Sequence, residues 1–136
     1  MKPTAIICDI DGTLAHMIDR SPYDPTKYHT DAIDTVIREI VNMYNRDRDV
    51  ILLSGRQEVG RRVTEQWLDD NAVNYTYLYM RADNDNRSDD IVKRELYDEH
   101  IKPHYDILFV LDDRDRVVKM WRQQGLKCLQ VAEGDF

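Results

Sequence analysis

Short apolar segments alternate along this chain with longer amphipathic segments, and this alternation constrains the fold more than any other feature. The short segments are rich in β-branched and aromatic residues, and the longer ones carry apolar residues at helical spacing. The predicted strands cover residues 4–8, 50–53, 75–80, 107–111 and 128–131, and the predicted helices cover about 30–44, 58–70, 88–101 and 114–124. Such an order forms a parallel sheet with helices on both faces. The sequence therefore predicts an α/β fold: one three-layer domain over residues 1–136, with a five-stranded, mostly parallel sheet.

Three local features of this pattern are specific enough to be checked. The first helix is expected to begin at Thr30 or Asp31, either of which can cap it, because apolar residues follow at helical spacing: Ile33, Val36, Ile37, Ile40, Val41 and Tyr44. Residues 14–29 contain two prolines and show no clean periodicity, so they predict a loop or a small flap. The segment 107–111 is expected to be the most deeply buried strand.

The charge balance is acidic, with 26 Asp and Glu against 19 Lys and Arg and a formal net charge of −7. Of these acids 20 are Asp and 6 are Glu, and Asp is a helix cap, a turn former and a ligand for hard metal ions. The balance argues against a protein held to nucleic acid by bulk positive charge, although it does not exclude a local basic groove.

Several classes of protein are excluded or made less favourable by what the sequence lacks. No apolar run approaches the roughly 18 residues that cross a bilayer, and no GxxxxGK[ST] loop is present, which excludes a P-loop kinase. Cys8 and Cys128 lie in apolar stretches without a zinc-binding pattern, so we expect two buried free thiols. This cysteine usage fits the reducing cytoplasm, and no membrane association is expected.

Polar residues gather at the carboxyl ends of three predicted strands, where ligands bind in sheets of this kind. They follow the first, second and fourth strands: Asp9, Asp11, Gly12 and Thr13; Ser54, Gly55 and Arg56; Asp112, Asp113 and Arg114. Carboxylates grouped this closely repel one another and take up protons unless a cation neutralises them. Mg²⁺ is the cation expected, because hard oxygen ligands are present and His and Cys are absent from these turns.

A metal site that also holds Ser and Arg suits a phosphate substrate. Asp9 can attack phosphorus and form an aspartyl-phosphate, and Asp11, two residues further, can act as the general acid and base. Ser54 can donate a hydrogen bond to a phosphate oxygen, and Lys93 can neutralise charge in the transition state. Asp89 lies four residues before Lys93, where an ion pair between them would orient the lysine.

Each of these motifs alone has a simpler interpretation. The Asp9–Asp11 pair can be a turn, Asp112–Asp113 can cap the next helix, and Asp89–Lys93 can be a solvated ion pair. All four motifs in order, on the appropriate elements, are far more specific than any one of them.

This ordered set resembles the haloacid dehalogenase superfamily of phosphotransferases. Its first motif, DxDGT, appears as residues 9–13, and the other three correspond to Ser54, Lys93 and Asp112–Asp113. A narrower resemblance, over nearly the whole chain, is to the 3′-phosphatase domain of bacteriophage polynucleotide kinase-phosphatase. The residues on which this resemblance rests are Arg20 with residues 22–24, residues 54–56, 89–90 with 93, 103–106, 112–114, 120–122 and 134–136. The fold implied is a Rossmann-like domain without a cap and with a small flap at about residues 14–29.

The resemblance also implies roles at matching positions. Asp9 would be the nucleophile and a Mg²⁺ ligand, and Asp11 the acid/base, binding the metal through its carbonyl oxygen. Asp112 would bind Mg²⁺, with Asp113 assisting through water, and Asp89 would position Lys93. The implied phosphate- or substrate-binding set is Ser54, Gly55, Arg56, Arg20, Asp89 and Arg114, together with Lys93.

The implied substrate is a 3′-phosphorylated RNA or DNA end or nucleotide, with a 2′,3′-cyclic phosphate as a further candidate. The gaps from Asp9 to Ser54 and from Ser54 to Lys93 are 45 and 39 residues, which leaves no room for a cap domain. An open mouth suits a polymer end, and eight basic residues are candidates for its rim: Arg20, Lys27, Arg56, Arg61, Arg81, Arg87, Arg114 and Arg116.

Because this sequence lacks the kinase half of the bacteriophage enzyme, a role in repair is expected to need separate kinase and ligase partners. Two alternatives stay open at this point. One is a capless phosphatase of small nucleotides or sugar phosphates, and the other is a non-catalytic metal-binding module that docks a partner.

Overall fold

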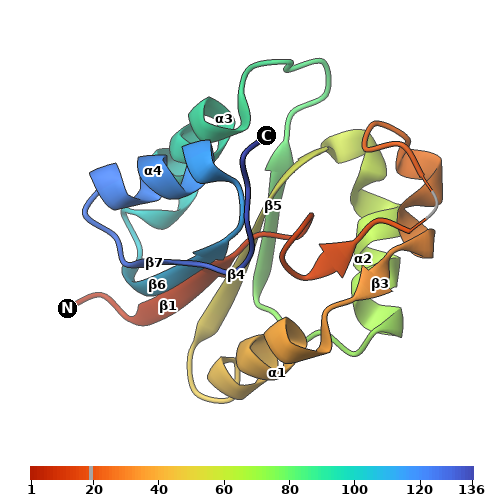
Figure 1. Ribbon diagram of the computed structural model, residues 1–136. Coiled ribbons are helices and arrows are strands. Elements are labelled where there is room, and N and C mark those ends of the chain that lie inside the picture. Colours follow the sequence, from red (N-terminus) through yellow and green to blue (C-terminus); the bar gives the residue numbers. More distant parts are fainter. Residues whose placement is uncertain (19) are drawn as a thin grey trace.

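The computed structural model describes residues 1–18 and 20–136 and contains a five-stranded parallel sheet. The strands lie in the order β5-β4-β1-β6-β7, and every neighbouring pair is parallel, which confirms the predicted α/β class (Figure 1). Their bounds are β1 (Thr4–Cys8), β4 (Asp49–Gln57), β5 (Tyr77–Arg81), β6 (Asp106–Asp112) and β7 (Cys128–Gln130). The first strand is central, so its carboxyl end lies between those of β4 and β6.

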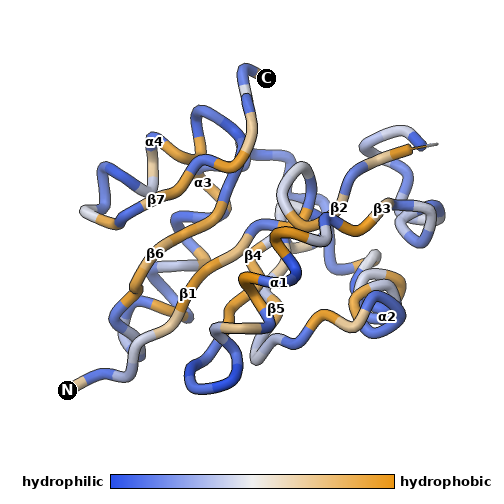
Figure 2. The backbone as a smooth tube through the Cα atoms, turned by 60° about the horizontal axis from the view of Figure 1, so that its bottom comes forward, coloured by the Kyte–Doolittle hydropathy of each residue, from blue (hydrophilic) through white to orange (hydrophobic). Residues whose placement is uncertain are grey.

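Helices cover both faces of the sheet and complete the three predicted layers (Figure 1). Their bounds are α1 (Thr35–Tyr44), α2 (Arg61–Asp70), α3 (Asp89–Leu96) and α4 (Asp115–Gln123). Alternate residues of β1 point to opposite faces: Ile6 packs with the α1 and α2 side, and Ile7 with the α3 and α4 side. In Figure 2, apolar segments, drawn in orange, lie along the strands of the sheet. Among the described residues, no helix combines the length and apolar character needed to cross a membrane.

A small flap follows β1 and consists of a two-stranded antiparallel hairpin with a 3-10 helix over Pro25–Thr30. The hairpin strands are β2 (Ala15–His16) and β3 (Ala32–Ile33). The flap predicted over residues 14–29 is present and continues to Ile33, while residue 19 lies outside the described part of the chain.

The predicted start of the first helix is wrong. This helix begins at Thr35, and its cap is Asp34, whose carboxylate accepts a hydrogen bond from Ile37 N at 3.0 Å. The reason is the hairpin: residues 32–33 are extended to pair with β2, which prevents the helix from starting at Thr30 or Asp31. Val36, in the first turn of the helix, is 67% exposed, and the helix buries Ile37 and Val41 instead.

Other boundaries differ by a few residues. The second strand continues through the Ser54–Arg56 segment to Gln57, and the third runs from Tyr77 to Arg81 rather than from residue 75 to 80. The helix predicted over 58–70 begins as a 3-10 turn, and the helix predicted over 88–101 ends as a π-helical turn over Tyr97–Ile101. The strand expected to be the most deeply buried exposes 44% of Leu108. Both cysteines are free and buried, as predicted.

Candidate active site

Three buried carboxylates meet where β1 and β6 end. Asp9 follows β1, and Asp112 and Asp113 stand at the end of β6, the strand hydrogen-bonded to β1. Asp9 N donates to Leu111 O at 2.9 Å, which extends the pairing of the strands to the site. One oxygen from each of the three carboxylates lies within 4.8 Å of the other two. The sheet thus places residues about 100 positions apart in a single cluster.

Lys93 of α3 joins this cluster from the helical layer. Its ammonium lies 2.8 Å from Asp9 Oδ1 and 3.0 Å from Asp112 Oδ2, and only 1% of the residue is exposed. Burial alone would lower the pKa of Lys93, but the charges of Asp112 and Asp9 raise it well above its usual value. The lysine is therefore charged and fixed between the two carboxylates.

The cluster carries more negative charge than Lys93 balances. Burial, and then the charge of Asp112, raise the pKa of Asp9 well above its usual value, and burial also raises the pKa of Asp113. Three carboxylates against one ammonium leave an excess of two negative charges, which a divalent cation would neutralise. Carboxylate oxygens are the ligands that a hard cation prefers. The residues present therefore fit a metal site of the kind predicted.

The turn after Asp9 depends on Gly12 and Thr13. Gly12 has a φ of +83°, and a Cβ atom there would lie 2.1 Å from Asp113 Oδ2, so both backbone conformation and space require glycine. Thr13 Oγ1 donates to Asp9 Oδ2 at 3.2 Å and also lies 3.4 Å from Asp113 Oδ1. This turn brings the first and fourth motifs into contact.

Ser54 lies at the same edge, on β4. Its side chain is buried, and its hydroxyl oxygen accepts a hydrogen bond from Arg56 N at 3.1 Å. The hydroxyl donates to no acceptor in the described part of the chain, so its proton is available to an anion.

The Asp11 carboxylate points to two arginines rather than to the metal cluster. Arg56 donates to both of its oxygens, at 2.7 and 3.0 Å, and Arg20 donates to Oδ1 at 3.1 Å. The same two guanidiniums bind Asp31 at 2.7 to 2.9 Å, and both lie against the ring of Tyr28, 3.9 and 4.7 Å from its centroid. Burial would raise the pKa of Asp11, but hydrogen bonds and charge from Arg56, and the charge of Arg20, hold it below its usual value.

Asp89 makes different contacts from those predicted. Its carboxylate accepts hydrogen bonds from Arg81 at 2.6 Å and from Arg114 at 3.2 Å, while Lys93 turns to the metal cluster. The expected Asp89–Lys93 ion pair is therefore replaced by ion pairs of Asp89 with Arg81, at the end of β5, and with Arg114. Gly55 permits this arrangement: a Cβ on it would lie 2.1 Å from Asp89 Oδ1.

The predicted basic rim is largely neutralised. The side chains of Arg20 and Arg56 are 1 and 2% exposed and are covered by the flap, so neither forms an open rim. Four of the remaining arginines have carboxylate partners: Arg61 with Glu58, Arg81 and Arg114 with Asp89, and Arg87 with Asp85 and Glu95. Arg116 is exposed, and Arg114 is 29% exposed, so these two are the better candidates beside the mouth.

Sequence reasoning missed Asp31, Tyr28, Thr64 and the inward position of Arg81. Asp31 looked like a helix cap, yet its side chain is fully buried between two guanidiniums, and its carbonyl accepts from Trp67 Nε1 at 2.9 Å. Thr64 accepts from Arg56 Nη1 at 3.0 Å. Of these residues, only Arg81 could have been predicted from the sequence to lie at the site, because it directly follows a predicted strand at the edge that holds the site.

The fold and this site together define a phosphatase domain of the haloacid dehalogenase superfamily. Residues 3–136 match the family described as the polynucleotide kinase PNKP phosphatase domain. The chain therefore belongs to the PNKP phosphatase-domain family, which confirms the resemblance inferred from its motifs.

Individual relatives agree with this assignment. The chain is 32% identical over 127 residues to a candidate bifunctional polynucleotide kinase/RNA ligase of the Autographa californica nuclear polyhedrosis virus. That match covers 88% of this chain and 18% of the viral protein. Two solved structures of the Pnkp1/Rnl/Hen1 complex, one described as an RNA repair complex, contain chains that match at 42% identity with a TM-score of 0.96. These matches cover 99% of this chain and 44 and 48% of those chains, so this chain spans less than half of each relative.

Proposed function

We propose that this domain is a Mg²⁺-dependent polynucleotide 3′-phosphatase that acts through an aspartyl-phosphate on Asp9. The observation that carries the proposal is the cluster of Asp9, Lys93, Asp112 and Asp113 at the carboxyl edge of the sheet, with the hydroxyl of Ser54 at the same edge. A nucleophilic carboxylate, an ammonium and a hydroxyl donor are what phosphoryl transfer from a monoester needs.

In the first step, an oxygen of Asp9 attacks phosphorus, and the bond from phosphorus to the 3′ oxygen breaks. Lys93, 2.8 Å from Asp9 Oδ1, holds this carboxylate and faces the negative charge that develops on the phosphoryl oxygens. Ser54 donates its free hydroxyl proton to one of those oxygens. Bound Mg²⁺, held by Asp9, Asp112 and Asp113, would neutralise phosphate charge.

Asp11 serves the leaving group. Its side chain is 37% exposed, in contrast to 7% for Asp9, so it can reach both the leaving oxygen and solvent water. The two arginines hold the pKa of Asp11 below its usual value, so Asp11 must leave these contacts and take up a proton before it can donate it to the 3′ oxygen in the first step. The ionised carboxylate then takes a proton from the attacking water in the second step. The second step breaks the aspartyl-phosphate and releases inorganic phosphate. Arg20 and Arg56 orient this carboxylate before substrate binds.

The openness of the site supports a polymer end as the substrate. The described segments between Asp9 and Ser54 form only the flap, α1 and part of β4, and those between Ser54 and Lys93 form the end of β4, α2, β5 and a loop. Neither contains a domain that would enclose a small substrate. The likeness to chains of an RNA repair complex favours RNA ends. Removal of the 3′-phosphate leaves the hydroxyl that a ligase uses, so we propose that kinase and ligase activities complete the repair.

The test compares wild type with Asp9→Asn, with and without Mg²⁺, on a panel of phosphate esters. The panel holds a 3′-phosphorylated RNA and its DNA equivalent, an RNA with a 2′,3′-cyclic phosphate, a mononucleotide and a sugar phosphate. We expect wild type to release phosphate from the 3′-phosphorylated ends with higher kcat/KM than from small esters, only with Mg²⁺, and Asp9→Asn to release none. A preference for small esters would favour a small-molecule phosphatase. Absence of turnover on every substrate would favour a non-catalytic docking module.

A further inference from the structure

The last segment of the chain is fixed to the loop that carries Asp112 and Asp113. Val131 N donates to Asp112 O at 3.1 Å, and Gly134 O accepts from Asp115 N at 2.9 Å. A Cβ atom on Gly134 would lie 1.8 Å from Asp113 O, so only glycine allows this close approach. The segment therefore holds its final residue in a defined place beside the site.

That final residue is Phe136, an aromatic side chain at the edge of the phosphate site. The guanidinium carbon of Arg114 lies 4.5 Å from the centroid of its ring, and Arg114 also binds Asp89 at 3.2 Å. Phe136 N donates to Gly134 O at 2.9 Å, which restrains the backbone at this point. The ring is thus anchored on one substrate-site residue, although 57% of Phe136 is still exposed.

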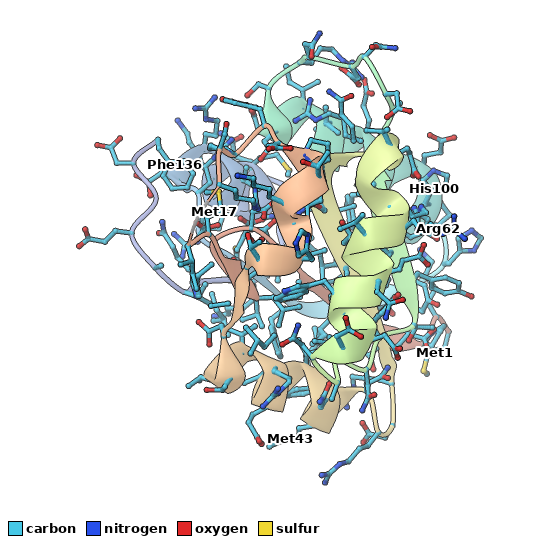
Figure 3. The ribbon with its side chains drawn as sticks, turned by 90° about the vertical axis from the view of Figure 1, so that its right-hand side faces the viewer. Met1, Met17, Met43, Arg62, His100 and Phe136 are labelled. Carbon is cyan, nitrogen blue, oxygen red and sulfur yellow. The ribbon has the colours of Figure 1, made fainter. Side chains whose placement is uncertain are left out.

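The ring and the flap lie on the same side of the molecule. Figure 1 shows the final segment running from β7 past α4 toward the middle of the molecule, with β2 and β3 of the flap on the other side. In Figure 3, Phe136 and Met17 of the flap lie on the same side of the molecule, away from His100 and Arg62. A sugar and base attached to a phosphate at Asp9 would leave the site on this side of the molecule, between the flap and the final segment.

We propose that Phe136 stacks on the base of the terminal nucleotide and so favours a nucleic-acid 3′ end over a phosphate ester without a base. An exposed aromatic ring beside a phosphate site binds bases of any sequence, because every base presents a π face. Arg114 below the ring stabilises it in this position through a cation–π contact. This inference rests on the proposed function, because it concerns the nucleoside attached to the phosphate that the site cleaves.

The test uses two oligonucleotides that differ at one position. Both carry a 3′-phosphate, and the terminal nucleotide has its base in one and is abasic in the other. With wild type and Mg²⁺, we expect Phe136→Ala to raise KM for the base-containing end about 5-fold or more, with little change in kcat. Phe136→Trp should retain the wild-type KM. On the abasic end, wild type and Phe136→Ala should have the same KM.

Three outcomes would count against the inference. An unchanged KM for Phe136→Ala on the base-containing end would overturn it, and so would an equal increase on both ends. If wild type released no phosphate from either oligonucleotide, the proposed function itself would fail, and the inference with it. Circular dichroism and thermal unfolding of Phe136→Ala test whether a change in KM comes from misfolding.

Discussion

The two carboxylates that share Arg20 and Arg56 differ in burial, and this difference gives a sharp prediction about Asp31→Asn. The Asp31 side chain is fully buried and binds both guanidiniums at 2.7 to 2.9 Å, whereas that of Asp11 is 37% exposed. Replacing Asp31 by Asn keeps the shape of the side chain but removes its charge. Two guanidiniums that are 1 and 2% exposed are then left with Asp11 as their only carboxylate among these contacts.

The expected loss of stability is large. Removing one partner of a buried ion pair costs about 3–5 kcal/mol, and because Asn still offers one acceptor oxygen we expect about 3 kcal/mol. For a chain of 136 residues the unfolding entropy near 60 °C is about 0.3 kcal/mol/K, so the Tm should fall by roughly 10 °C.

The assay is thermal and urea unfolding of wild type, Asp31→Asn and Asp11→Asn at pH 7, with phosphate release measured in parallel. Asp11→Asn is the matched control, because the same arginines bind it but water reaches it. We expect it to lose about 1 kcal/mol or less and to abolish phosphatase activity. A loss below about 1 kcal/mol for Asp31→Asn, or a larger loss for Asp11→Asn, would refute the assignment of Asp31 as the buried anchor of both arginines.

Three further predictions concern the helix cap, the glycine turns and the metal. Asp34→Ala should lower the free energy of unfolding by about 1 kcal/mol at pH 7, and Asp34→Asn by less, since Asn also caps. Burial would raise the pKa of Asp34, but its hydrogen bonds hold it below its usual value. The charge of Asp34 therefore stabilises the fold above a pH of about 4. Below that pH, the difference in Tm between wild type and Asp34→Asn should shrink. Gly12 and Gly125 have φ of +83° and +82°, so Gly125→Ala should lose about 1–2 kcal/mol in unfolding. Of the two, only at Gly12 would a Cβ meet another group, Asp113, so Gly12→Ala should lose more stability and should also lose phosphate release. Saturating Mg²⁺ should raise the Tm of wild type by several degrees relative to EDTA, and a thermal-shift assay should find this increase absent in Asp112→Asn.

The parts of the site that the sequence predicted are those set by strand ends. Asp9, Ser54, Asp112 and Asp113 follow strands that are recognisable from apolar runs, and parallel strands bring their carboxyl ends to one edge. Lys93 joins them because α3 packs across that edge. The contacts of these residues follow from topology, so the motifs were sufficient to predict which of them come together.

The contacts that the sequence did not predict arise from tertiary packing. Asp31 and Asp34 are both good helix caps three residues apart, and only the pairing of β3 with β2 decides which one caps and which one is buried. Asp89 was expected to bind Lys93 because four residues separate them on a helix. Instead it binds Arg81, from β5, and Arg114, which follows β6. The spacing of residues within one helix cannot predict contacts with side chains of other elements.

The most direct test of the account is the search for phosphate bound covalently to the protein. An RNA carrying a radiolabelled 3′-phosphate is mixed with wild type and Mg²⁺, and the reaction is stopped with acid within its first turnover. We expect an acid-stable, hydroxylamine-sensitive label on the peptide that contains Asp9, and none on Asp9→Asn. Release of labelled phosphate without any labelled protein, or a label on another residue, would contradict the proposed role of the buried cluster.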